Sequence, residues 1–257
     1  MERIVTVLTA LATLAVTSFT WVSITQVRDD QSITREGQIT DRFNAAVANV
    51  GSKSLDVRLG GIYALQRIMQ DSERDQPTVI NILSAYVRAH ASRSKSTQEA
   101  PPSDVAAALS VLAFRNEGHD GSARVNLRST YLRGATLFNL TLDHKDEAQI
   151  FLHGGNFEGA DLDEADLTKA RLPGTNLNRA SLSGTELGYA SMPGVKLRGA
   201  SMSGTVLKGA DLNHADLTNA YLRNADLTGA NLTGANLTGA DLTGAILTGA
   251  KVEDVTR

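Results

Sequence analysis

Residues that could carry out acid–base, metal or nucleophilic chemistry are few and scattered in this sequence. It contains no cysteine, so disulfides, thiolate nucleophiles and cysteine-ligated metals are excluded. Its histidines show no spacing typical of metal ligands; they are His90, His119, His144, His153 and His214. We find no nucleophile, base and orienting group in a catalytic arrangement. The sequence therefore predicts a protein that is not an enzyme, has no cofactor and carries its histidines on the surface.

The titratable residues with a regular spacing are acidic. They are separated by 20 residues or by twice that number, and they are Asp146, Asp166, Glu186 and Asp226. If the chain returned to the same side of the molecule every 20 residues, these carboxylates would form one negative stripe. Whether they do depends on the element that carries them.

That element is a five-residue repeat, which extends from Leu127 to Val252. Of the 26 positions in this register, 21 are Leu, two are Met, one is Phe157 and one is Val252, and Glu147 alone is polar. The residue two before the Leu is Ala in 16 of the 26 repeats, and the residue two after it is Gly in 14. A helix with 3.6 residues per turn does not explain this pattern.

An odd repeat has a geometric consequence in extended chain. Side chains of a strand alternate between its two faces, so a Leu at every fifth position would point outward every second time. A Leu that always points inward requires one turn of the chain in each repeat. Gly tolerates the backbone angles of such a corner, and a small Ala fits beside the Leu side chains in the interior. The sequence therefore predicts a coil with short sides and an aliphatic core.

Two consecutive repeats show the pattern most clearly, Ala225-Asp226-Leu227-Thr228-Gly229 and Ala230-Asn231-Leu232-Thr233-Gly234. They resemble the repeats of pentapeptide-repeat proteins. The resemblance implies a mainly β fold, a right-handed quadrilateral β-helix with four repeats in each coil, over residues 123–257. One polar unit, Asp143 to Gln149, is expected to bulge out as a loop, with the register resuming at Leu152.

The acidic stripe then has two interpretations. Some pentapeptide-repeat proteins resemble B-form DNA and bind DNA gyrase, and in such a protein this stripe would be the natural contact. Alternatively, aspartate simply suits the position before Leu. Residues 123–257 hold 15 acidic and 13 basic side chains, and Lys208 neighbours the stripe, which favours the second interpretation. The net charge of −3 also argues against direct nucleic-acid binding.

Residues 31–115 are expected to form a small α-helical module, because apolar residues recur every three or four positions in four segments. Pro77 suits the first turn of the third segment, and residues 91–103 read as a linker. The side chains predicted to face inward are Ile39, Phe43, Ala46, Val47, Leu55, Leu59, Ile62, Leu65, Met69, Val79, Leu83, Val87, Val105, Leu109 and Leu112. The stretch from Gly37 to Arg88 resembles the module before the repeats in membrane-anchored bacterial members, and more weakly a HEAT helix pair.

Residues 1–30 are predicted to hold one transmembrane helix. Residues 4–27 contain no charged side chain, and at about 1.5 Å per residue they can cross the roughly 30 Å hydrocarbon layer. Hydroxyl side chains form one stripe of this helix, which suits self-association; they are Thr6, Thr9, Thr13, Thr17 and Thr20. A cleaved signal peptide and a buried soluble helix are the alternatives. Many relatives of this type carry two membrane helices here.

The sequence as a whole predicts a non-catalytic scaffold in the cell membrane, with an unidentified protein partner. Arg28, Arg35 and Arg42 follow the span, whereas Arg3 precedes it, so the C-terminal body is placed in the cytoplasm. The helical module is expected to cover the first coil of the solenoid. The last coil is a second place for self-association. The alternative function is a DNA-mimicking binder of DNA gyrase or another topoisomerase.

Overall fold

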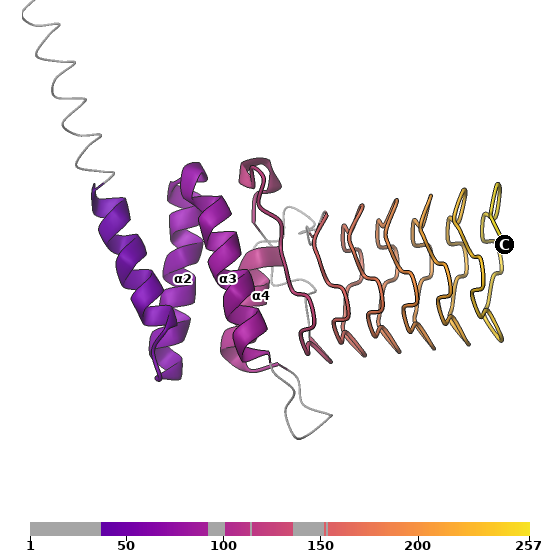
Figure 1. Cartoon of the computed structure of the whole chain (residues 1–257), viewed down its shortest axis with the longest axis horizontal. Helices are drawn as coiled ribbons and strands as arrows, with labels where there is room; N and C mark the ends of the chain where they lie inside the picture. The colour runs from indigo at the N-terminus through magenta and orange to yellow at the C-terminus, as the bar shows by residue number, and fades with distance from the viewer. Residues whose placement is uncertain (1–36, 92–100, 114, 136–151, 153) are drawn as a thin grey trace, which may run out of the picture.

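The computed structural model describes residues 37–91, 101–113, 115–135, 152 and 154–257. Helices lie side by side at one end of the molecule, and a long coiled body extends from them along the molecule's longest axis (Figure 1). Residues 37–50 are helical. The further elements are α2 (Leu55–Asp71), η1 (Glu73–Asp75), α3 (Gln76–His90), α4 (Ser103–Ala113) and η2 (Glu117–His119).

The helical module folds around its apolar stripes, as the spacing predicts. In α2 the buried apolar side chains are Ile62, Leu65, Ile68 and Met69. Helix α3 begins with Pro77 in its first turn and buries Val79, Leu83 and Val87. Helix α4 buries Val105, Leu109 and Leu112. These stripes pack against one another because α2, α3 and α4 contact each other in all three pairs.

Two residues predicted to face inward are exposed. Val47 is 37% exposed, because the buried stripe of its helix consists of Ile39, Ala46 and Val50, and Val47 lies about 100° round the helix from Ala46. Leu55 is 40% exposed, because it is the first residue of α2 and precedes the turn that packs on the other helices. The apolar period was therefore correct, but the predicted inward stripe was too wide at Val47 and began too early at Leu55.

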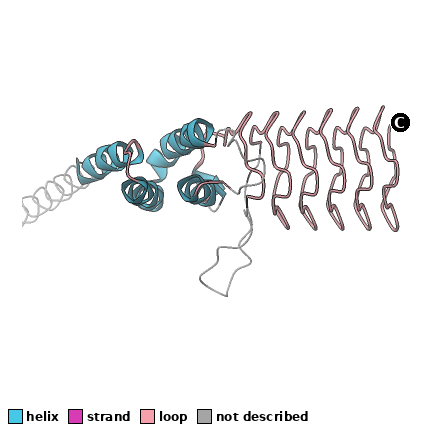
Figure 2. Ribbon diagram, turned by 90° about the horizontal axis from the view of Figure 1, so that it is seen from below, coloured by secondary structure: helices cyan, strands magenta, loops and turns pink. Residues whose placement is uncertain are grey.

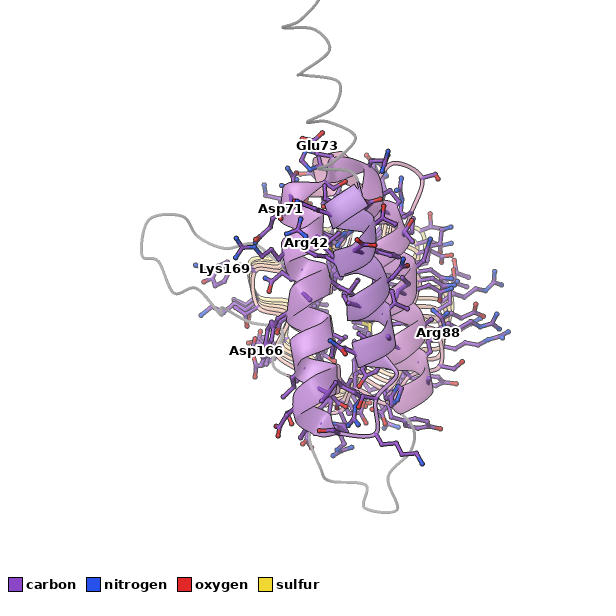
Figure 3. The ribbon with its side chains drawn as sticks, turned by 90° about the vertical axis from the view of Figure 1, so that its left-hand side faces the viewer. Arg42, Asp71, Glu73, Arg88, Asp166 and Lys169 are labelled. Atoms are coloured by element: carbon purple, nitrogen blue, oxygen red, sulfur yellow. The ribbon has the colours of Figure 1, made fainter. Side chains whose placement is uncertain are left out.

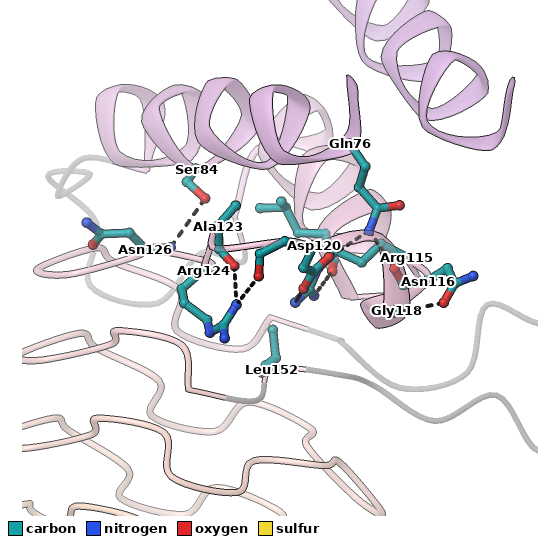
Figure 4. A network of polar contacts seen from close by, with 12 residues as sticks. Gln76, Ser84, Arg115, Asn116, Gly118, Asp120, Ala123, Arg124, Asn126 and Leu152 are labelled. Atoms are coloured by element: carbon teal, nitrogen blue, oxygen red, sulfur yellow. Dashed lines mark hydrogen bonds and ion pairs between the residues drawn. The ribbon is translucent and has the colours of Figure 1, made fainter. Parts of the chain in front are cut away.

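A buried ion pair fixes the segment between α4 and the coiled body (Figure 4). Arg115 Nη2 lies 2.6 Å from Asp120 Oδ2, and its Nη1 donates to Leu112 O at 2.6 Å. Gln76 Nε2 donates to Asp120 Oδ1 at 2.6 Å. These hydrogen bonds and the ion pair offset the desolvation cost of burying the Arg115 and Asp120 charges.

The coiled body is a parallel β-helix with four sides, each built from single-residue bridges between positions 20 apart. Side 1 is Asn156, Asn176, Lys196, Asp216, Asn236 and Thr256. Side 2 is Asp161, Ser181, Ser201, Tyr221 and Asp241. Side 3 is Asp166, Glu186, Val206, Asp226 and Ile246. Side 4 is Arg171, Ser191, Asp211, Asn231 and Lys251.

Repeats with a coil on both sides make the same backbone bonds, and the coils stack evenly (Figure 2). Leu187 N donates to Val206 O in the next coil at 2.8 Å, and Ala190 N closes the corner on Leu187 O at 3.1 Å. The corner residue two after the Leu has a positive φ, as at Gly209 (+65°). The predicted coil with inward Leu and Ala side chains is therefore confirmed: Leu187 and Ala190 are at most 1% exposed.

Threonine replaces alanine at several inward positions without leaving a buried hydroxyl unpaired. The Thr175, Thr185 and Thr205 side chains are fully buried. Each hydroxyl donates to the carbonyl oxygen of a Leu in the coil below, at 2.7 to 2.8 Å. These bonds offset the cost of burying a hydroxyl, so the interior accepts Thr where a backbone acceptor is in reach.

The first coil differs from the expected one. Asn126 pairs with Asn156 and Tyr131 with Asp161, and both pairs are 30 residues apart instead of 20. The first described coil therefore takes 30 residues of the chain, whereas each later coil takes 20. Residues 136–151, which include the predicted loop, lie outside the described residues.

Helix α3 covers the first edge of the β-helix, as expected. Asn126 N donates to Ser84 Oγ at 3.3 Å, and Tyr131 N donates to Ala91 O at 3.2 Å. Arg88 Nη1 donates to Asn126 O. At the far end, Leu247 and Val252 are 37% and 44% exposed. The helical module thus supplies acceptors to N–H groups that would otherwise be unpaired.

No helix in the described part of the chain is both long and apolar enough to span a bilayer. The predicted span, residues 4–27, and its threonine stripe lie outside the described residues.

Candidate interaction surface

The acidic residues of the predicted stripe lie on side 3. Asp166 pairs with Glu186, and Val206 lies between Glu186 and Asp226 in the same column. Ile246 completes the column above Asp226 and is 50% exposed. The structure therefore brings three of the four residues into one column. The order in this column is Asp166, Glu186, Val206, Asp226 and Ile246.

The fourth residue, Asp146, lies outside the described residues. Asp166 N donates to Ala135 O at 3.2 Å, whereas Glu186 N donates to Ala165 O at 2.9 Å. The coil below Asp166 is thus reached about 30 residues earlier in the chain, not 20. The prediction that placed Asp146 in the stripe assumed that every coil contains 20 residues.

The aspartates of side 3 have a local structural role. Asp166 Oδ1 accepts a hydrogen bond from Thr168 N at 3.0 Å, and Asp226 Oδ1 accepts one from Thr228 N at 2.9 Å. Hydrogen bonds from the Thr228 side chain and backbone, together with the charge of Lys208, hold the pKa of Asp226 below its usual value. The same bond recurs on the other sides, as from Thr218 N to Asp216 Oδ1. An acceptor before the Leu therefore stabilises the corner that follows it.

The described histidines lie apart from one another. His90 stacks on Tyr86 with ring centroids 4.1 Å apart, and His119 lies 3.0 Å from Glu73. His214 lies over Gly234 at a corner of the β-helix. Among the described residues, no three His, Asp or Glu side chains come together as metal ligands. His144 and His153 lie outside the described residues.

Sequence reasoning missed the charge of side 1. Arg88 lies on the flank opposite Asp166 and Lys169 when the molecule is viewed along its axis (Figure 3), and Arg88 contacts Asn126, the first residue of side 1. Each corner is counted in the side before it. Side 1 then carries Arg128, Arg179, Lys196, Arg198 and Arg257 against Glu158 and Asp216. Sorting the sequence by position in a 20-residue coil could have revealed this excess.

Sequence comparison places the repeats in a known family. The family model for pentapeptide repeats matches eight copies, over residues 152–184, 175–213 and 210–249. No curated protein sequence matches the chain.

Several solved structures are similar to this chain. HetL, a pentapeptide repeat protein involved in heterocyst differentiation regulation in Nostoc, is 30% identical over 52% of this chain and 64% of its own, with a TM-score of 0.26. A second pentapeptide repeat protein from Nostoc is 47% identical over 29% of this chain and 62% of its own, with a TM-score of 0.29. One from the thylakoid lumen of Arabidopsis thaliana is 33% identical over 42% of this chain and 68% of its own, with a TM-score of 0.24.

The chain thus spans less than two thirds of the length of the two Nostoc proteins. The matched repeats coincide with the described coils, in which Leu fills the interior and Gly or Asn turns the corners. The chain therefore belongs to the pentapeptide-repeat family, whose members form right-handed β-helices.

Proposed function

We propose that this protein is a non-catalytic scaffold that presents the outer surface of a rigid β-helix to a protein partner. The supporting observation is the division of side chains in the described coils. Leu and Ala fill the interior at 0% to 1% exposure in most repeats, so the outward side chains are those that a partner can contact. Backbone bonds between successive coils hold these outward side chains at fixed positions.

Photo-crosslinking in cells tests this function. A photoreactive amino acid is placed at one exposed position on each side, namely at Lys208, Arg223, Thr238 and Glu253. A scaffold should give a discrete adduct from at least one side, and the unreacted neighbouring sides serve as its controls. The absence of an adduct from all four sides would contradict the proposal.

Membrane anchoring through residues 4–27 is part of this proposal, with the body of the protein in the cytoplasm. Its support is the uncharged length of that segment and the arginines that follow it. Fractionation of cells with a carbonate wash tests the anchor. The protein should stay with the membranes, and its recovery in the soluble fraction would exclude the anchor but not the scaffold.

The gyrase-directed alternative is supported by the column of Asp166, Glu186 and Asp226 on side 3. Its weakness is that Val206 and Ile246 alternate with those carboxylates, whereas the phosphates of DNA are evenly spaced. A gyrase supercoiling assay with the full chain in a neutral detergent decides between the two. Unchanged supercoiling at micromolar protein removes the alternative; inhibition that disappears with Glu186→Gln would establish it.

A further inference from the structure

Side 1 contains a hollow of about 300 Å³, lined by Glu158, Asn178, Arg179, Arg198, Gly199 and Asn219. Its floor is the corner residue Gly199, which has no side chain. Arg179 occupies the equivalent corner one coil below, and Asn219 the corner one coil above. The Arg179 side chain extends over Gly199, because a Cβ at Gly199 would lie 3.9 Å from Arg179 Cγ.

Two exposed guanidinium groups at this hollow make no ion pair with a described residue. They belong to Arg179 and Arg198, whose side chains are exposed. Other arginines of the β-helix are paired: Arg133 lies 2.6 Å from Glu164, and Arg223 lies 3.6 Å from Asp241. The hollow thus holds two positive charges against one carboxylate, that of Glu158, which lies 3.8 Å from Arg128.

Arg179 is one of nine described corner residues of the β-helix that are not Gly and have a positive φ. It occupies a corner with a φ of +58°, where most repeats have Gly. A side chain with a Cβ costs about 1 kcal/mol in this left-handed region. Since its guanidinium makes no ion pair with a described residue, Arg179 can bind an external anion.

We propose that the hollow binds a carboxylate on an acidic segment of a partner protein. Arginine forks match carboxylates in paired hydrogen bonds, and the Asn178 and Asn219 amides can add donors. Side 1 is the one described side on which basic residues outnumber acidic ones, so electrostatic attraction favours this side for an acidic segment.

The same charges argue against a phosphate chain. Glu158 lines the hollow, and Asp216 stands one coil above Lys196 on side 1. A nucleic acid would need a continuous row of cations. The cations of side 1 that make no ion pair with a described residue are instead Arg179 in one coil, Lys196 and Arg198 in the next, and Arg257 three coils further on. This arrangement suits a compact anion such as one or two carboxylates.

The proposal rests on the scaffold function and identifies the partner's chemistry. The test is selection from a displayed library of random peptides against the full chain in a neutral detergent. Recovered peptides should be enriched in Asp and Glu. The best one, labelled for fluorescence anisotropy, should bind about tenfold or more weakly to the Arg179→Gly, Arg198→Ala double variant.

A matched double variant, Lys169→Gly with Arg223→Ala, removes a corner cation and an outward cation from two other sides and should leave the affinity unchanged. Arg179→Gly should not lower the melting temperature, which separates lost binding from lost folding. The proposal would be overturned if no acidic peptide is recovered or if the peptide binds equally to both double variants. It would also be overturned if duplex DNA or inorganic phosphate displaces the labelled peptide at a lower concentration than the unlabelled peptide does. A crosslinked adduct from sides 2 to 4 would leave the scaffold function standing even then.

Discussion

Arg58 on α2 forms an ion pair with Asp104 on α4, and the hydroxyl of Tyr86 on α3 donates a hydrogen bond to the same carboxylate. Arg58 Nη2 lies 2.7 Å from Asp104 Oδ2, and the Tyr86 hydroxyl donates to the same oxygen at 2.6 Å. The Asp104 side chain is only 3% exposed. Burial by itself raises the pKa of Asp104, but the hydrogen bonds from Tyr86 and Arg58 outweigh burial, so its pKa lies below the usual value. One carboxylate thus links three helices of the module that caps the β-helix.

Replacing Asp104 with Ala should destabilise the helical module by about 3 kcal/mol, because the Arg58 and Tyr86 donors lose their shared acceptor in a nearly buried site. The quantity to measure is the free energy of unfolding from the helical circular dichroism signal in urea. Asp71→Ala is the matched control, because it removes an ion pair with Arg42 that is exposed and should cost below about 1 kcal/mol. Equal effects of the two changes would contradict the assigned role of Asp104.

The module should also lose stability in alkali through Tyr86. Burial, and next the hydrogen bond to Asp104, raise the pKa of Tyr86 from 10.0 to about 12. A raised pKa means that the stabilising contribution is complete below pH 10 and is lost as the pH rises through about 12. Tyr86→Phe should be less stable at neutral pH and should lack this part of the alkaline decline. Parallel alkaline curves for the two proteins, from thermal melts at fixed pH values, would exclude this role.

The sequence predicted the coil but not every feature of its surface. The inward Leu and the corner Gly follow directly from the period of five, because an odd repeat forces a turn. The break near Glu147 marked an irregular unit but did not predict the 30-residue spacing of Asn126 and Asn156, since a sequence pattern does not record which residues pair across coils. The Arg58–Asp104 pair is 46 residues apart in sequence, with no periodicity to reveal it.

The interior of the β-helix should reject a charge that its outer surface accepts. Leu187 is 0% exposed, so Leu187→Asp buries a carboxylate without a partner and should unfold the coils, at a cost of several kcal/mol. Asp166→Ala, the control, removes only the hydrogen bond from Thr168 N and should cost about 1 kcal/mol. Thermal melts followed by the β signal in circular dichroism measure both. A folded, cooperative Leu187→Asp protein would disprove the inward assignment.

Two corner glycines, one coil apart, separate backbone strain from side-chain crowding. Gly209 and Gly229 have φ values of +65° and +67°, so alanine at either should cost about 1 kcal/mol for the left-handed backbone. A Cβ at Gly209 would lie 2.7 Å from the ring of Tyr189, whereas at Gly229 nothing lies within 4 Å. Gly209→Ala should therefore lower the melting temperature more than Gly229→Ala. The excess is expected to come from the Tyr189 ring. Gly209→Ala made in a Tyr189→Ala protein should therefore cost no more, relative to Tyr189→Ala alone, than Gly229→Ala costs in the unaltered protein. An excess that survives in the combined variant would place the strain in the backbone instead.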